Sequence, residues 1–181
     1  MKYITDDFAV AGQITFEDIE RAARDGFKAI INNRPDGEEN GQATAGEFAA
    51  HARECGVAYY HVPTPGDRLD PGAVDGMRRV LSEAPVPVLA YCRSGKRSFS
   101  LWLLEQVRAG TVDEEEMESF AQRVGYDVDV ARESLARLCE GPKPRPIVDG
   151  FFEPRTFSIQ YIVRDPASDR CAIIDPVLDY D

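Results

Sequence analysis

The segment VPVLAYCRSGKRS, residues 86–98, joins a predicted strand to a predicted helix through a short polar loop. The apolar run over residues 86–91 predicts a buried strand, which tolerates Pro87 because this residue lies near the start. Ser98 opens an apolar helix that ends at Gly110. The order strand, loop, helix is typical of α/β proteins.

Strand and helix signals alternate over the rest of the chain as far as about residue 110. Threonine and glutamate lie three residues apart in Thr44/Glu47 and Thr111/Glu114, which predicts a capping box in each case. Strands joined by helices predict an α/β fold with a central, mostly parallel sheet and helices on both faces. The expected strands cover residues 7–10, 27–32, 57–62 and 86–91, and the expected helices begin near Thr15, Thr44, Ala73, Ser98, Val112 and Val128.

The composition describes a globular protein and excludes several classes of partner. The chain has 181 residues, 43% of them hydrophobic, and a formal net charge of −11. Such an acidic chain is a poor candidate for binding nucleic acid or an anionic membrane. No apolar run approaches the ~20 residues of a membrane-spanning helix, and no secretory signal is visible. We therefore expect a cytoplasmic protein.

The cysteines and histidines predict free thiols and no metal centre. None of Cys55, Cys92, Cys139 and Cys171 belongs to a CxxC pair, and a domain of this size needs no disulfide. The two histidines are too few for a zinc site. His61 is expected to be a packed, hydrogen-bonded core residue, and His51 is expected to be solvated.

The composition changes after about residue 140. Residues 141–150 are rich in proline and predict a linker between residues 1–140 and a second segment, 151–181. The alternating run 156–163 and the short run 171–174 predict a β-hairpin with its turn at 165–169. A lone hairpin is marginally stable in water, so we expect residues 151–181 to be the incomplete start of a second domain.

The loop after the 86–91 strand has the features of an anion-binding site with a nucleophile. Four residues, 93–96, separate Cys92 from Arg97. The loop N–H groups and the helix N-terminus can form a concave nest for an anion, and Gly95 permits the necessary bend. Arg97 offers a planar fork to an oxyanion. This environment favours the thiolate of Cys92, a nucleophile toward phosphorus or sulfane sulfur.

The loop also contains two further cationic side chains. Arg93 and Lys96 place positive charge in an otherwise acidic chain, which would attract small anionic substrates. The alternative is that Cys92 is merely a small buried hydrophobe at a strand end.

The loop resembles two families of cysteine enzymes. Cys92-x-x-Gly95-x-Arg97 resembles the rhodanese sulfurtransferase signature, in which the cysteine carries a persulfide. The stretches YYHVPTPGD, residues 59–67, and AYCRSGKRS, residues 90–98, look like dual-specificity phosphatases. Those phosphatases have five residues between cysteine and arginine, and a histidine where Tyr91 stands. A shorter loop makes a tighter cradle, which suits a single sulfur atom better than a tetrahedral phosphoryl group.

Residues 9–38, 59–67 and 90–98 together resemble the phosphatase-like domain of beta-lactamase hydrolase-like proteins, which are bacterial proteins linked to sulfide detoxification. The resemblance covers about residues 1–140 and implies a cysteine-phosphatase-like fold. Residues 151–181 are similar to the opening of the persulfide dioxygenase domain, of metallo-β-lactamase fold, that follows in those fusions. The histidine-rich motif that supplies its iron ligands is not in this sequence, so the resemblance implies no metal and no other cofactor here.

The resemblance implies roles for the loop residues. Cys92 would be the sulfur carrier and Arg97 the anion anchor. Ser98 stands where phosphatases have a hydroxyl that eases departure of the thiolate, although it can equally be an ordinary first-turn helix residue. The remaining residues expected to line the loop are Arg93, Ser94, Gly95 and Lys96.

Two residues outside the loop are candidates for the same site. Asp67 lies where phosphatases keep a general acid that protonates the leaving oxygen, although it can also be a simple turn former; Asp70 is a weaker candidate. Arg34 follows an earlier strand and could reach the same rim, because sites in open α/β sheets lie at the carboxyl ends of the strands. Its alternative is a surface or loop-bracing arginine.

Three functions remain open on this reading. The leading hypothesis is a sulfurtransferase that moves sulfane sulfur from a small anionic donor to a thiol acceptor through a Cys92 persulfide. The first alternative is a cysteine phosphatase that passes through a phosphocysteine and uses Asp67 as the acid. The second is a non-catalytic module that serves a fused or partner persulfide dioxygenase.

Overall fold

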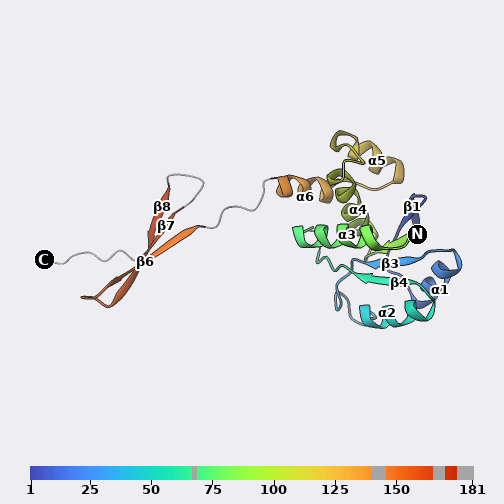
Figure 1. The fold of residues 1–181 in the computed structure, drawn as a ribbon, viewed down its shortest axis with the longest axis horizontal. Helices are drawn as coiled ribbons and strands as arrows, with labels where there is room; N and C mark the ends of the chain where they lie inside the picture. Colours follow the sequence, from blue (N-terminus) through green and yellow to red (C-terminus); the bar gives the residue numbers. More distant parts are fainter. Residues whose placement is uncertain (67–68, 140–145, 165–169, 175–181) are drawn as a thin grey trace. The chain divides into compact units, whose positions relative to one another are not determined.

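The computed structural model describes residues 1–66, 69–139, 146–164 and 170–174, with side chains described up to residue 136 in the last helix of the first unit. The chain divides into two compact units, Met1–Cys139 and Glu140–Asp181. Figure 1 shows the first unit as a sheet with helices and the second as strands.

The first unit is built on a five-stranded sheet in the order β1-β2-β5-β3-β4. All neighbouring strands run parallel except β1, which pairs antiparallel with β2 at one edge. This confirms the expected mostly parallel sheet, and it places β5, the strand before Cys92, at the centre. The strands are β1 (Lys2–Thr5), β2 (Phe8–Ala11), β3 (Ala29–Asn32), β4 (Ala58–His61) and β5 (Val88–Tyr91).

Helices cover both faces of this sheet, as predicted. Figure 1 shows α1 and α2 below the sheet and α3, α4, α5 and α6 above it. Each layer buries its own hydrophobic cluster against the strands. The helices are α1 (Phe16–Arg24), α2 (Ala45–Glu54), α3 (Pro71–Glu83), α4 (Lys96–Arg108), the 3₁₀ turn η1 (Glu114–Glu116), α5 (Met117–Val124) and α6 (Asp129–Cys139).

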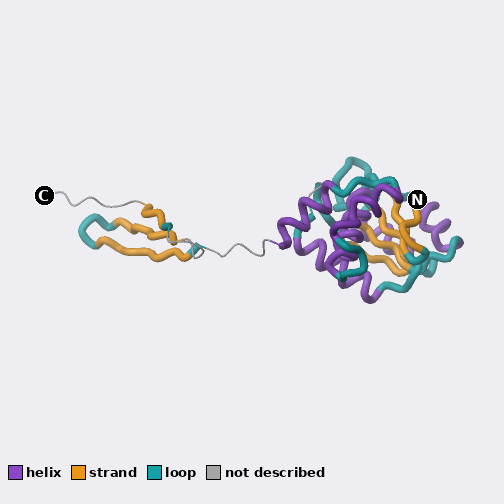
Figure 2. The backbone as a smooth tube through the Cα atoms, turned by 90° about the horizontal axis from the view of Figure 1, so that it is seen from above, coloured by secondary structure: helices purple, strands orange, loops and turns teal. Residues whose placement is uncertain are grey.

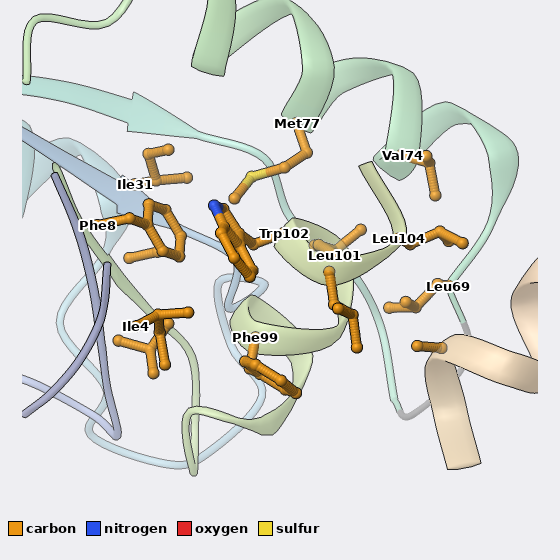
Figure 3. Close-up of a cluster of buried hydrophobic side chains, with 14 of the residues drawn as sticks. Ile4, Phe8, Ile31, Leu69, Val74, Met77, Phe99, Leu101, Trp102 and Leu104 are labelled. Carbon is orange, nitrogen blue, oxygen red and sulfur yellow. The ribbon is translucent and has the colours of Figure 1, made fainter. Parts of the chain in front are cut away.

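The larger cluster fixes α4 against the sheet. Figure 3 shows side chains of α4, among them Phe99 and Trp102, gathered with side chains of the strands and of α3. The Trp102 ring stacks on Phe8 of β2 with 5.4 Å between ring centroids, and Tyr126 stacks on Phe99 at 4.6 Å. Because α4 follows the cysteine loop directly, this packing holds one end of the loop in place.

The helices expected near Thr15 and Thr44 both begin with a threonine cap. The Thr15 and Thr44 side chains each accept a hydrogen bond in the first turn, within complete capping boxes. The capping box expected at Thr111 is wrong. The Thr111 hydroxyl bonds to Gln106 instead, and the 3₁₀ turn begins after Asp113 without a side-chain cap.

Two strands were not expected from the sequence. β1 lies ahead of the predicted first strand and pairs with it across a tight turn. In the second unit β6 (Ile147–Glu153) begins inside the stretch expected to be linker.

β5 starts at Val88, two residues later than expected, because Pro87 has no N–H to donate to a neighbouring strand.

The second unit is an antiparallel sheet in the order β6-β7-β8, with β7 at Ser158–Arg164 and β8 at Cys171–Ile174. The pairing of β7 with β8 confirms the expected hairpin, whereas its turn at 165–169 lies outside the described residues. Figure 2 shows this unit as strands and loops, in contrast to the helix-covered sheet of the first unit. Among the residues that the structure describes, no helix has the length and apolar character needed to cross a membrane.

Candidate active site

Cys92 lies immediately after the central strand β5 and is fully buried. Its Sγ accepts a hydrogen bond of 3.1 Å from the backbone N–H of Gly95, so the sulfur rests against a polar group of its own loop. Gly95 has φ of 89°, in the left-handed region that favours glycine. A Cβ at Gly95 would also lie 2.8 Å from the Tyr126 hydroxyl and 3.3 Å from the Ala11 carbonyl oxygen. The loop conformation therefore requires glycine here.

The segment after β2 supports the same loop from the side. The Gln13 N–H donates to the Arg93 carbonyl oxygen at 3.2 Å, and the Cys92 N–H donates to Ala11 at 3.4 Å. At Gly12 a Cβ would come within 3.3 Å of that Arg93 oxygen, so this side of the loop approaches the neighbouring backbone closely. The carboxyl ends of β2 and β5 thus position the loop together, as expected for an open α/β sheet.

Arg97 lies in the first turn of α4, and its guanidinium is held by two protein acceptors. Nη1 donates to the Thr64 carbonyl oxygen at 2.6 Å, and Nη2 lies 2.7 and 2.9 Å from the two carboxylate oxygens of Glu38. Arg97 itself is buried. Both terminal nitrogens are therefore engaged, whereas no acceptor for Nε–H is found among the described residues.

Glu38 connects Arg97 to Arg34, the other arginine that the sequence predicts near the site. Arg34 donates from Nε to Glu38 at 2.7 Å, from Nη1 to Gln13 at 2.6 Å and from Nη2 to Glu39 at 2.8 Å. Arg34 is buried, at 3% exposed. The structure thus brings Arg34 and Arg97 together through one shared carboxylate, and Gln13 links this ion network to the cysteine loop.

The charges of this network shift the pKa values of its members. Partial burial raises the pKa of Glu38, but Arg97 and Arg34 lower it more, so the net pKa lies below the ordinary 4.5. Burial lowers the pKa of Arg34, but its hydrogen bonds to Glu39 and Glu38 raise it more, so the net pKa lies above the ordinary value for arginine. Both side chains therefore remain charged at neutral pH.

The other residues expected to line the loop lie in different settings. Arg93 and Ser94 are exposed, and the exposed Lys96 ammonium pairs with Asp127 at 2.7 Å. Ser98 is fully buried, and its Oγ has no hydrogen-bond partner in the part of the chain that the structure describes. That hydroxyl therefore has a free donor and acceptor in the first turn of α4.

Neither aspartate of the 63–71 loop is seen at the site. Asp67, the predicted general acid, lies outside the described residues. Asp70 is the N-cap of α3, where its side chain accepts from the Ala73 N–H at 2.9 Å. Asp70 therefore has a structural role at the start of a helix.

Neither histidine lies in the setting expected from the sequence. His61 is exposed on the edge strand β4, so the expectation of a packed core residue is wrong, whereas the expected hydrogen bond is present, with Nε2 3.0 Å from the Arg34 carbonyl oxygen. His51 is mostly covered, with its side chain 25% exposed and its ring against Phe16, so the expectation of a solvated position is also wrong.

Four residues at the site were missed by the sequence analysis: Glu38, Thr64, Gln13 and Tyr126. Tyr126 follows α5 and brings its hydroxyl to Gly95. Burial raises the pKa of Tyr126, and the negative charge that a Cys92 thiolate would carry raises it further. The sequence carried no signal for Tyr126, because 31 positions separate it from Gly95 in the chain.

Tyr91, which stands where dual-specificity phosphatases have a histidine, faces the other side of the sheet. Its hydroxyl lies 2.8 Å from that of Tyr59 on β4, and its ring packs edge-on against Phe48. Burial raises the pKa of Tyr59 to about 12 and also raises that of Tyr91. Both hydroxyls are therefore neutral at physiological pH.

Comparisons with known proteins show which proteins the chain is similar to. Residues 1–109 match the family model described as beta-lactamase hydrolase-like protein, phosphatase-like domain. A beta-lactamase hydrolase-like protein of Agrobacterium fabrum is 36% identical over 178 residues, which cover 98% of this chain and 41% of that protein. The chain thus spans about two fifths of the length of that relative.

Solved structures place the fold among phosphatases. A structure from Neisseria meningitidis described as a candidate phosphatase is 31% identical, with a TM-score of 0.64, and the match covers 75% of this chain and 96% of that one. The phosphatase Tk-PTP in its active form has the same fold at 19% identity, with a TM-score of 0.56 and coverage of 75% and 96%. With the family match over residues 1–109, these likenesses show that the chain belongs to the phosphatase-like domain family of beta-lactamase hydrolase-like proteins.

Proposed function

We propose that the first unit is a cysteine-dependent phosphatase that hydrolyses small phosphate monoesters through a phosphocysteine on Cys92. The observation that carries this proposal is the joint placement of two groups. The Cys92 sulfur lies under a loop amide, and the Arg97 guanidinium is fixed in the first turn of the helix that follows. The likeness of the fold to phosphatase structures supports the same reading.

The reaction would proceed in two displacements at phosphorus. The Cys92 thiolate attacks the phosphorus atom, so that an S–P bond forms while the bond to the alcohol oxygen breaks, and an acid protonates the departing oxygen. Water then attacks the phosphocysteine, the S–P bond breaks, and the conjugate base of that acid takes the proton. The loop amides and Arg97 stabilise the negative charge on the phosphoryl oxygens in both steps. We propose Asp67 as the acid and the Ser98 hydroxyl as the group that eases departure of the thiolate.

Hydrolysis of an aryl phosphate by the purified chain tests this function. Cys92→Ser should reduce kcat/KM by at least about a thousandfold, because the nucleophile is lost. The matched control is Cys55→Ser, which removes a half-buried thiol away from the loop and should leave the rate unchanged. A phosphorylated Cys92 trapped by rapid acid quench and seen by intact mass would support the pathway, whereas equal rates in both variants would refute it.

A sulfurtransferase is the second candidate, favoured by the four-residue spacing between Cys92 and Arg97. In that reaction the Cys92 thiolate attacks the sulfane sulfur of a donor such as thiosulfate, an S–S bond to Cys92 forms while the S–S bond of the donor breaks, and sulfite leaves. A thiol acceptor then takes the sulfur. A thiosulfate:cyanide assay run beside the phosphatase assay separates the two functions, and Asp67→Asn should slow only the phosphatase.

We further propose that the second unit begins a larger domain, for which the persulfide dioxygenase of the resembling fusions is the candidate. The curated relative extends well beyond the length that this chain covers. In such a protein the first unit could supply substrate to the attached domain. Expression of the chain with the rest of a relative's sequence, followed by assay of both activities, would test this arrangement.

A further inference from the structure

The carboxyl end of β3 carries a buried asparagine to which the proposed reaction gives no role. Asn33 follows β3 directly and has no exposed surface. Its backbone N–H donates to the carbonyl oxygen of Tyr91, the residue before Cys92, at 2.8 Å. Asn33 is therefore anchored to the strand that carries the proposed nucleophile.

The other hydrogen bonds of Asn33 reach the segment that follows β4. Its side-chain Nδ2 donates to the Val62 carbonyl oxygen at 3.1 Å, and its own carbonyl oxygen accepts from the Thr64 N–H at 3.1 Å. The Thr64 carbonyl oxygen in turn accepts the 2.6 Å bond from Nη1 of Arg97. These bonds make a path from β5 through Asn33 and Thr64 to Arg97, and the cysteine loop closes it.

Few other bonds hold the segment 62–64 in place. β4 lies at the edge of the described sheet, with β3 as its one neighbouring strand. Pro63 has no N–H to donate. In the part of the chain that the structure describes, the bonds between this segment and the sheet go to Asn32 and Asn33, and the Asn33 amide makes the one that involves a side chain. Loss of that amide should therefore let the Thr64 carbonyl move.

The Asn33 amide is itself only partly satisfied. Its Oδ1 is buried and has no hydrogen-bond partner among the residues described. A buried acceptor without a partner is unfavourable. An apolar side chain of similar size, such as leucine, would avoid this penalty, so stability alone does not favour asparagine at this position.

We propose that Asn33 is a positioning residue for Arg97. It holds the segment 62–64 so that the Thr64 carbonyl oxygen keeps the guanidinium where it can bind the anion that Cys92 attacks. The inference rests on the proposed phosphatase function, in which Arg97 binds the phosphoryl oxygens. It assigns the placement of Arg97 to a side chain that does not touch the substrate.

The test measures anion binding separately from turnover. Tungstate, a tetrahedral oxyanion that is not hydrolysed, is assayed for its ability to slow alkylation of Cys92 by iodoacetamide. Asn33→Leu should raise the tungstate concentration for half protection about threefold to tenfold, while the urea midpoint of unfolding stays close to that of the natural chain. Leu135→Ala, which removes a buried side chain of α6, is the control. It should lower the urea midpoint and leave the protection unchanged.

A double-mutant cycle separates positioning from a merely structural role. In a chain that carries Arg97→Ala, the loop amides still bind tungstate at higher concentrations, and Asn33→Leu should cause no further loss of protection. The reason is that the group that Asn33 positions is then absent. Unchanged protection in the single variant, or losses that add in the double variant, would overturn the proposal.

Asn33→Asp provides a second reading through pH. Its carboxyl can donate to the Val62 carbonyl oxygen only when it is protonated, and burial favours the protonated form. The half-protection concentration relative to that of the natural chain should therefore fall toward one as pH is lowered from about 8 to about 6. An elevated ratio that stays constant over this range would contradict the assigned bond.

The proposed function can fail separately from this inference. Its failure would show as no turnover of any phosphate ester by the natural chain. The protection of Cys92 by tungstate needs no turnover, so it tests the role of Asn33 in either case.

Discussion

Two short apolar strands of similar length have opposite environments in this molecule. All four residues of β5 in the first unit are buried, whereas all four residues of β8 in the second unit are exposed. Ile30 beside β5 has no exposed surface, whereas Ile173 of β8 is 61% exposed. The difference lies in the layers: helices cover both faces of the first sheet and, in the described residues, neither face of the second. The apolar character of a strand therefore does not by itself show that its side chains are buried.

The same difference between the two units explains why Cys92, and not Cys171, lies in a rigid environment. The loop around Cys92 is fixed because the strand before it and the helix after it are both packed in closed cores. The second unit offers no comparable support among its described residues, and its cysteine, Cys171, is exposed. A preorganised site needs a rigid surrounding shell, which the packed cores of the first unit supply.

The largest expected effect concerns the core itself. Trp102→Ala should lower the free energy of unfolding by about 3–5 kcal/mol, because it leaves a cavity where the ring stacked on Phe8. Ile173→Ala should change it by less than about 0.5 kcal/mol. Urea denaturation followed by circular dichroism measures both. A comparable loss from Ile173→Ala would show that β8 is packed after all.

Glu38→Gln tests the ion network and should reduce kcat/KM for an aryl phosphate about tenfold to a hundredfold, because Arg97 loses the carboxylate that positions it. The fall should be mainly in kcat, and Glu38→Asp should restore part of it. The matched control in the second unit is Asp149→Asn, which removes an exposed ion pair with Arg164. Unchanged kinetics in Glu38→Gln would mean that Thr64 alone positions the guanidinium.

Gly95→Ala tests the left-handed turn of the loop. The substitution should cost about 1–2 kcal/mol of stability, because alanine is unfavourable at positive φ, and the overlap with the Tyr126 hydroxyl should add to this. Combining it with Tyr126→Phe should recover the part due to overlap. Gly150→Ala in β6, where a Cβ would lie 3.4 Å from the Tyr161 ring and 3.9 Å from the Ile159 side chain, should be close to neutral. If Gly150→Ala lowered the stability as much as Gly95→Ala, the backbone strain assigned to position 95 would be contradicted.

The smallest expected effect is the pH dependence of the Glu38 network. The folded-state pKa of Glu38 is below its ordinary 4.5, so its stabilising contribution is fully present above that value and is lost as pH falls through the folded pKa. The difference in unfolding free energy between the natural chain and Glu38→Gln should therefore narrow as pH is lowered below about 4.5. A difference that stays constant down to pH 3 would contradict this linkage.

The sequence predicted the first unit well because its signals are local. The capping residues Thr15 and Thr44 mark helix starts by chemistry within three positions, and the order of strand, Cys92, Gly95 and helix is contiguous. The mostly parallel sheet followed from the alternation of strands and helices, and the structure confirms it.

What the sequence could not predict depends on contacts between distant segments. Glu38 lies in a turn whose glycine and proline mark a loop, and nothing local shows that its carboxylate reaches Arg97, 59 positions away. The first four residues of β6 fall in the predicted linker, 141–150, because prolines precede them, although pairing with β7 satisfies the backbone of Ile147–Glu153. Thr111 has the spacing of a cap, but the Gln106 carbonyl competes successfully for its hydroxyl.

The shared carboxylate between Arg34 and Arg97 has a consequence for how substrates arrive. The positive charges of the two guanidinium groups are balanced by the carboxylates of Glu38 and Glu39, so this group of four side chains has no net charge. The whole chain has a formal net charge of −11. A phosphate dianion therefore meets a repulsive field at long range. The dianion is attracted only within one Debye length of the site, ~8 Å at physiological ionic strength. At that distance the nearby N–H donors act on it more strongly than the net charge of the chain. Under the proposed phosphatase function, substrate capture is consequently a short-range event, governed by donor geometry rather than by electrostatic steering.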